Sequence, residues 1–91
     1  MTGVFFQLLG RPRDGAPARL GVVVGRKADK RAVARNYIKR TVRETFRLEA
    51  EGLAGLDIVV RARKSFSREQ GAAARAELLA LLVRLQRKCR V

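Results

Sequence analysis

The residues with the clearest chemical potential are basic and lie close together between positions 26 and 47. This window holds nine Lys or Arg against two acidic residues, so it carries +7 of the net charge of +13 on 91 residues. Guanidinium groups bind phosphate oxygens through paired N–H donors, and a helix start adds free backbone N–H groups. The window therefore predicts a site for a polyanion such as nucleic acid. The candidate binding residues are Arg26, Lys27, Lys30, Arg31, Arg35, Asn36, Lys39, Arg40, Arg43 and Arg47.

The helical period of residues 32–51 predicts that one helix positions most of these groups. At about 100° per residue, the candidates from Arg35 to Arg47 cover an arc of about 140°, which we call the basic stripe. Its like-charge pairs at i,i+4 each cost about 0.2–0.5 kcal/mol, so an external anion explains the stripe better than a merely solvated face does. The opposite arc, which we expect to face the core, carries Tyr37, Leu48, Thr41, Ala34, Thr45, Ile38 and Val42.

Residues for self-contained catalysis are missing from the sequence. There is no histidine, which excludes a Ser-His-Asp triad and a histidine-containing zinc site. The eight carboxylates are scattered, and we interpret Asp57 as a turn or capping group rather than a metal ligand. Residues 21–28 are a near miss for a phosphate-binding P-loop, because the glycine spacing is one residue short and no Ser or Thr follows Lys27. We therefore predict no catalytic residue and no metal ligand.

Composition limits the setting and the partners. A single cysteine, Cys89, cannot form an internal disulfide, and we expect it to be a small buried residue of a cytoplasmic protein. No apolar run reaches the roughly 18 residues of a membrane span. A basic helix lying on a membrane is a weak alternative, because the opposite face carries Thr and Tyr and the chain has no Trp. No protein partner is inferred.

The remaining pattern predicts the elements around the basic helix. Strands are expected over 4–9, 20–25 and 56–63, with turn chemistry over 10–18 that suggests a hairpin of the first two. Ser67 and Gln70 match a capping box, which predicts a last helix to about Lys88 with an apolar stripe. The order strand-strand-helix-strand-helix predicts an α/β (α+β) two-layer sandwich, one domain over 1–91 with helices on one face of a small sheet. The stripe comprises Ala74, Leu78, Leu81, Leu82, Leu85 and Cys89.

The other face of that sheet is expected to be open. In the third strand, the side chains of Ile58, Val60 and Ala62 fall on one side. Val59, Arg61 and Arg63 fall on the other, and two arginines identify this side as the one that faces solvent or a ligand.

Residues 35–44 read Arg-Asn-Tyr-Ile-Lys-Arg-Thr-Val-Arg-Glu, which resembles the Arg-Asn-x-x-Lys-Arg-x-x-Arg-Glu signature of the protein subunit of bacterial ribonuclease P. Residues 20–27 and 57–63 resemble the strands on either side of that signature, and the resemblance covers nearly the whole chain. Without the signature, a ribosomal-type RNA-binding protein or a basic DNA-binding module would fit the charge equally well.

The resemblance implies a non-catalytic subunit of an endoribonuclease that removes the 5′ leader from precursor tRNA. The partners would be the ribonuclease P catalytic RNA, bound by the basic stripe and the residues before it, and the precursor tRNA 5′ leader. Magnesium would be held mainly by the RNA. The leader would lie on the open sheet face, on Arg61, Arg63 and one of Phe5 or Phe6, either of which is equally well a core residue. A left-handed βαβ crossover is also implied.

Two departures from the family pattern are visible. Tyr37 stands where many members carry a second arginine, so a phosphate contact would be lost or replaced by a hydroxyl or stacking contact. The first expected strand begins at the start of the sequence, so the family's basic N-terminal helix, which walls the leader site, is expected to be lacking here.

Overall fold

The computed structural model describes residues 1–13 and 17–89, with only the backbone of Cys89. Two helices and three strands follow the predicted order, with a short 3₁₀ turn after the first helix. The expected turn at Asp14-Gly15 and the expected burial of Cys89 lie outside the described residues. The elements are β1 (Phe6–Pro12), β2 (Arg19–Val23), α1 (Ala32–Glu49), η1 (Glu51–Leu53), β3 (Leu56–Ala62) and α2 (Gly71–Cys89).

The strand order is β1-β3-β2, so the predicted hairpin of the first two strands is wrong. β1 runs antiparallel to β3, and β2 runs parallel to it on the other side. β3 has the most regular alternation of buried and exposed residues of the three strands. As the middle strand, it forms backbone hydrogen bonds with a neighbour on each side. Neighbouring strands lie about 5 Å apart, so the connection from β1 to β2 has only about 10 Å to cross. Turn residues in the sequence indicate that the chain reverses after β1, but they do not show that β3 will lie between β1 and β2.

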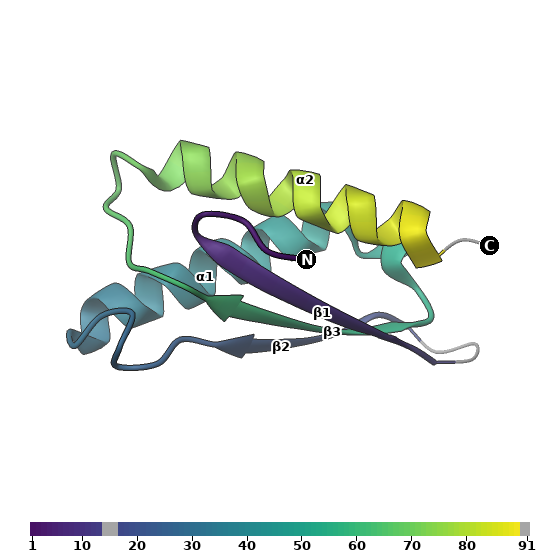
Figure 1. Cartoon of the computed structure of the whole chain (residues 1–91), viewed down its shortest axis with the longest axis horizontal. Helices are drawn as coiled ribbons and strands as arrows, with labels where there is room; N and C mark the ends of the chain where they lie inside the picture. Colours follow the sequence, from purple (N-terminus) through teal and green to yellow (C-terminus); the bar gives the residue numbers. More distant parts are fainter. Residues whose placement is uncertain (14–16, 90–91) are drawn as a thin grey trace.

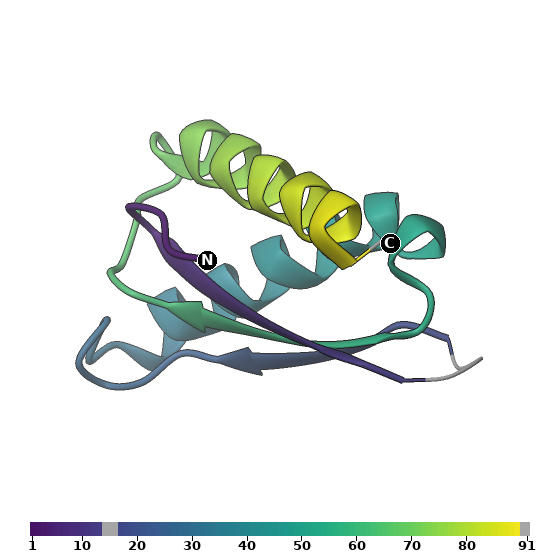
Figure 2. The same cartoon turned by 45° about the vertical axis from the view of Figure 1, so that its right-hand side comes forward.

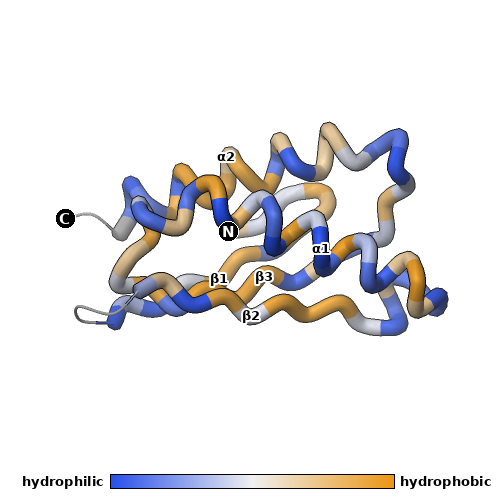
Figure 3. The backbone as a smooth tube through the Cα atoms, turned by 180° about the vertical axis from the view of Figure 1, so that it is seen from behind, coloured by the Kyte–Doolittle hydropathy of each residue, from blue (hydrophilic) through white to orange (hydrophobic). Residues whose placement is uncertain are grey.

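Both helices cover the same face of the sheet, as predicted (Figures 1 and 2). They also contact each other. The inner side of β3 supplies Ile58 and Val60, which are 1% exposed, and α1 supplies Ile38 and Val42, which are fully buried. Apolar residues lie along the middle of the strands, whereas hydrophilic residues recur along both helices (Figure 3). The result is a two-layer sandwich, and within residues 1–13 and 17–89 no helix covers the second face of the sheet.

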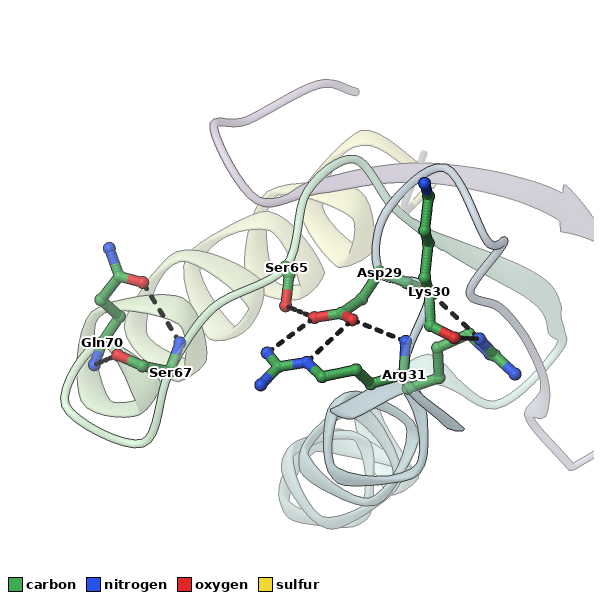
Figure 4. Close-up of polar contacts among 7 residues, drawn as sticks. Asp29, Lys30, Arg31, Ser65, Ser67 and Gln70 are labelled. Carbon is green, nitrogen blue, oxygen red and sulfur yellow. Dashed lines mark hydrogen bonds and ion pairs between the residues drawn. The ribbon is translucent and has the colours of Figure 1, made fainter. Parts of the chain in front are cut away.

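α2 confirms the expected helix and its start. The backbone N–H of Ser67 donates to the side-chain oxygen of Gln70 over 3.2 Å, and that of Gln70 donates to the Ser67 hydroxyl over 3.4 Å. This reciprocal pair is the predicted capping box, drawn in Figure 4. The stripe residues whose side chains are described are all buried, namely Ala74, Leu78, Leu81, Leu82 and Leu85.

Candidate nucleic-acid interface

The segment between β2 and α1, residues 24–31, is a turn that we call the connector. The backbone N–H groups of Ala28 and Asp29 donate to the Gly25 carbonyl over 3.0 and 3.4 Å. This reversal leaves Arg26, Lys27 and Lys30 exposed. Together with Arg35 of α1 they line a hollow of about 420 Å³. Four of the predicted binding residues therefore lie around one concave surface at the start of α1.

Asp29 fixes the connector from within. Its carboxylate accepts the Arg31 backbone N–H over 2.8 Å, the Arg31 guanidinium over 3.1 and 3.2 Å, and the Ser65 hydroxyl over 2.6 Å (Figure 4). The hydrogen bonds from Arg31 and Ser65 hold the pKa of Asp29 well below its usual range. The side-chain hydrogen bonds to Asp29, together with its negative charge, raise the pKa of Arg31. Arg31, predicted as a phosphate ligand, is thus first an ion-pair partner, although its side chain is 79% exposed.

Arg35 also has an internal role that its sequence position did not indicate. One nitrogen of its guanidinium donates to the backbone carbonyls of Asp29 and Lys30, over 3.1 and 2.8 Å. These bonds tie the first turn of α1 to the connector. Arg35 is half-buried and lines the hollow described above. Through its bonds to the two carbonyls it also fixes the connector against α1.

The exposed face of α1 carries the rest of the basic stripe. Its residues line a second, smaller hollow of about 370 Å³, in which Glu44 is the one carboxylate among the lining residues. The buried face consists of Ile38, Thr41, Val42 and Thr45, so the predicted division of the helix into two faces is correct. Leu48 is an exception, because it is 75% exposed rather than part of the inner face. The lining residues of the hollow are Asn36, Lys39, Arg40, Arg43, Glu44 and Arg47.

The open face of the sheet is lined as predicted by the outward residues of β3. In the register of the three strands, Arg61 lies between Gln7 and Val23, and Val59 lies between Leu9 and Gly21. Leu9 is 60% exposed and Val59 39%, so the middle of this face is apolar. A hollow of about 540 Å³ at one end brings Arg61 and Arg63 together with Arg26 and Lys27 of the connector. The two sets of predicted binding residues thus meet at this end.

The structure decides between the two candidate phenylalanines. Phe6 is fully buried and packs edge-on against Phe66 at 5.8 Å between ring centroids, so it is a core residue and does not reach the open face. Phe5 is half-buried and lies 4.9 Å from the Lys64 ammonium group. Alternation along β1 accounts for the difference, because Phe6 and Leu8 share the inner side. Of the two, only Phe5 is at the surface.

Two carboxylates have contacts that sequence reasoning missed. Asp57, interpreted as a turn or capping group, pairs instead with Arg13 at 3.0 Å and with Arg19 at 3.8 Å on the open face. Glu77 of α2 accepts three backbone N–H groups just before and at the start of β1, which we call the Glu77 clamp. The partners of Asp57 follow only from the strand order, and no local pattern marks Glu77. Both contacts join segments more than 35 residues apart in the sequence.

No helix in the described part of the chain is long and apolar enough to span a bilayer. No group of three or more His, Cys, Asp or Glu within residues 1–13 and 17–89 is arranged to hold a metal ion.

The chain is similar to known proteins in both sequence and structure. The family model for ribonuclease P matches residues 1–86. The ribonuclease P protein component of Chromobacterium violaceum is 55% identical over 89 residues, which make up 98% of this chain and 73% of that protein. The one from Thioalkalivibrio sulfidiphilus is 44% identical over 84 residues, or 92% of this chain and 70% of that one. The solved RNase P protein of Thermotoga maritima matches with a TM-score of 0.74 and 34% identity, covering 92% of this chain and 80% of that one.

These matches agree with the signature at residues 35–44 and with the observed order of elements. They extend over nearly the whole chain, both in sequence and in structure. The chain therefore belongs to the ribonuclease P protein family.

Proposed function

We propose that this protein binds the catalytic RNA of ribonuclease P through the connector and the basic stripe, and so supports removal of the 5′ leader from precursor tRNA. The observation that carries the proposal is the continuity of basic groups from the first hollow, at Arg26 and Lys27, along α1 to Arg47. Among the described residues, none of the side chains from Lys39 to Arg47 forms an ion pair. Their charges are therefore available to phosphates, and each contact releases counterions from the RNA.

In this proposal the RNA carries out the cleavage, and it also holds the magnesium ions. Two carboxylates near the candidate site are engaged in contacts of the fold, since Asp29 accepts from Arg31 and Ser65, and Asp57 pairs with Arg13. Glu44 is a single carboxylate among the basic residues of its hollow. A carboxylate held by arginine has little left to offer a hard cation, which takes six or more oxygen ligands. The chain's own contribution is then to bind and orient RNA and to neutralise phosphates that would otherwise repel each other near the bound ions.

We further propose that the single-stranded leader lies across the open sheet face. Arg61 and Arg63 supply charge at one end of this face, and Leu9 and Val59 supply an apolar surface on which bases can rest. Phe5 is the aromatic candidate at the edge. The hollow that joins Arg61 to Lys27 gives a continuous basic path from the leader to the catalytic RNA on the helix side.

The central test is reconstitution with a bacterial ribonuclease P RNA. Adding the protein should lower the magnesium concentration needed for cleavage of precursor tRNA, because cations on the protein replace part of the counterion atmosphere. Cleavage with an unchanged magnesium requirement would refute the proposed role.

A charge-matched pair of variants then tests the basic stripe. Arg40→Gln/Arg43→Gln and the control Arg84→Gln/Arg87→Gln each remove two exposed arginines, from α1 and from α2. The α1 variant should reduce the slope of log K against log salt for catalytic RNA by about 1.4–1.8, and the α2 variant should leave it unchanged. Equal slopes for the two variants would show that overall charge, not the stripe, binds the RNA.

The leader proposal needs its own comparison. Arg61→Gln should weaken binding of precursor tRNA to the holoenzyme by roughly threefold to tenfold, while binding of mature tRNA stays the same, since one phosphate contact is worth about 1 kcal/mol or more. Equal losses for both substrates would place Arg61 outside the leader site.

A further inference from the structure

Arg68 places an additional cation beside α1 from a different part of the chain. It belongs to the loop between β3 and α2, and its guanidinium carbon lies 5.6 Å from the centroid of the Tyr37 ring. The residue is exposed, and among the described residues it forms no ion pair. A guanidinium over an aromatic face keeps its N–H donors free at the edge of the ring. Arg68 can therefore hold a phosphate while resting on Tyr37.

Tyr37 is a fixed support for this arginine. Its ring packs edge-on against buried Phe66, with 5.7 Å between centroids. Its hydroxyl lies so close to Gly71 that a Cβ atom added there would be only 2.5 Å from the oxygen. The Tyr37 side chain thus extends from α1 to the loop before α2 and to the first residue of α2. It is not one of the exposed residues of the basic stripe.

The position of Tyr37 on α1 puts Arg68 next to the stripe. At about 100° per residue, Tyr37 lies about 60° around the helix from Arg40, on the flank of the exposed face. The loop that carries Arg68 is held on both sides, by Ser65 to Asp29 over 2.6 Å and by the capping box of Ser67. Little conformational freedom is then lost when the arginine binds an anion.

We propose that Arg68 is a further binding residue for a phosphate of the ribonuclease P catalytic RNA, held in place by Tyr37. This inference rests on the function proposed above. The catalytic RNA is preferred to the leader because Arg68 lies over Tyr37 of α1. Both helices lie on one side of the sheet, and the open sheet face is on the opposite side (Figure 2). The arginine widens the basic surface of α1 on its Tyr37 flank.

The experiment measures binding of the whole protein to the catalytic RNA alone as a function of salt. Arg68→Gln should make the slope of log K against log salt shallower by about 0.7–0.9. Between about 50 and 200 mM salt, the factor by which affinity falls should therefore be about three times smaller for Arg68→Gln than for the wild type. The matched control is Arg84→Gln, which removes one exposed arginine from α2 and should leave the slope unchanged. Identical slopes for Arg68→Gln and wild type would overturn the proposal. Failure of the wild type to bind would instead refute the function it rests on.

Variants at Tyr37 test the support. Tyr37→Phe keeps the ring and should keep the slope, whereas Tyr37→Leu removes the ring and should lower the slope as Arg68→Gln does. Arg68→Gln should then have no further effect in the Tyr37→Leu background, provided that circular dichroism shows Tyr37→Leu to be folded. Additive effects would show that Arg68 acts without Tyr37. A loss confined to precursor tRNA in the holoenzyme would assign Arg68 to the leader and contradict the proposal.

Discussion

The Glu77 clamp joins α2 to the first residues of the chain by three hydrogen bonds to one carboxylate. One oxygen accepts the Val4 N–H over 2.6 Å, and the other accepts the N–H groups of Phe5 and Phe6 over 2.8 and 3.1 Å. Glu77→Gln keeps the size of the side chain and replaces one of these oxygens by an NH₂ group, which cannot accept. We predict that this single change destabilises the protein and loosens the segment that carries Phe5.

The magnitude follows from the three bonds. With its carbonyl oxygen turned toward Phe5 and Phe6, the glutamine keeps two bonds and leaves the Val4 N–H facing another donor. Hydrogen bonds to a charged group contribute about 1.5–3 kcal/mol and neutral ones about 0.5–1.5 kcal/mol, so one bond is lost and two are weakened. Water can reach the Val4 N–H, whose bond is exposed, and this reduces the loss. We therefore expect the free energy of unfolding to fall by about 2 kcal/mol, or the Tm by about 8–16 °C.

Urea unfolding followed by circular dichroism measures this difference. The control is Glu69→Gln, an exposed residue near the start of the same helix, which should cost only about 0.3–0.5 kcal/mol through the helix dipole. Hydrogen exchange at the amides of Val4, Phe5 and Phe6 should also become faster in Glu77→Gln than in the control. Equal stability of the two variants, with unchanged exchange at these amides, would refute the reasoning.

Three further predictions concern stability. Asp29→Asn should destabilise the protein at neutral pH, because a pKa lowered by folding means that the charged Asp29 stabilises the fold above its pKa in the unfolded chain, about 4. In urea titrations below that pH, the difference in stability between wild type and variant should become smaller. Phe6→Ala should cost about 3–5 kcal/mol in the same assay, since the ring is fully buried, and a loss below 1 kcal/mol would contradict its core position. Gly71→Ala should destabilise by about 1–2 kcal/mol through contact with the Tyr37 hydroxyl and become neutral in a Tyr37→Phe background, so a cost that persists in the double variant would rule out that contact.

Periodicity predicted the parts of this structure that depend on neighbouring residues. The two faces of α1, the open side of β3 and the capping box of α2 each follow from spacings of two to four residues. Strand order could not be predicted in this way, because the same turn residues serve a hairpin and a connection that passes over a middle strand. The choice between Phe5 and Phe6 depended on the register of β1, which the adjacent apolar residues leave open.

The partners of the acidic residues are the contacts that local sequence patterns predict least well. Glu44 follows Arg40, and Glu51 follows Arg47, at the i,i+4 spacing at which opposite charges on a helix can pair and offset part of the repulsion. Among the described residues, neither pair forms an ion pair, and the ion pairs present lie at Asp29 and Asp57.

Four carboxylates instead make tertiary contacts. Asp29 joins the connector to the loop before α2, and Asp57 joins β3 to Arg13. Glu77 holds the start of the chain, and Glu49 accepts from Gln86 over 2.7 Å. These four acidic side chains thus hold segments together that are far apart in the sequence, while the basic stripe keeps its charge. Such a division suits the proposed function, in which the bound RNA rather than the fold would relieve the repulsion within α1.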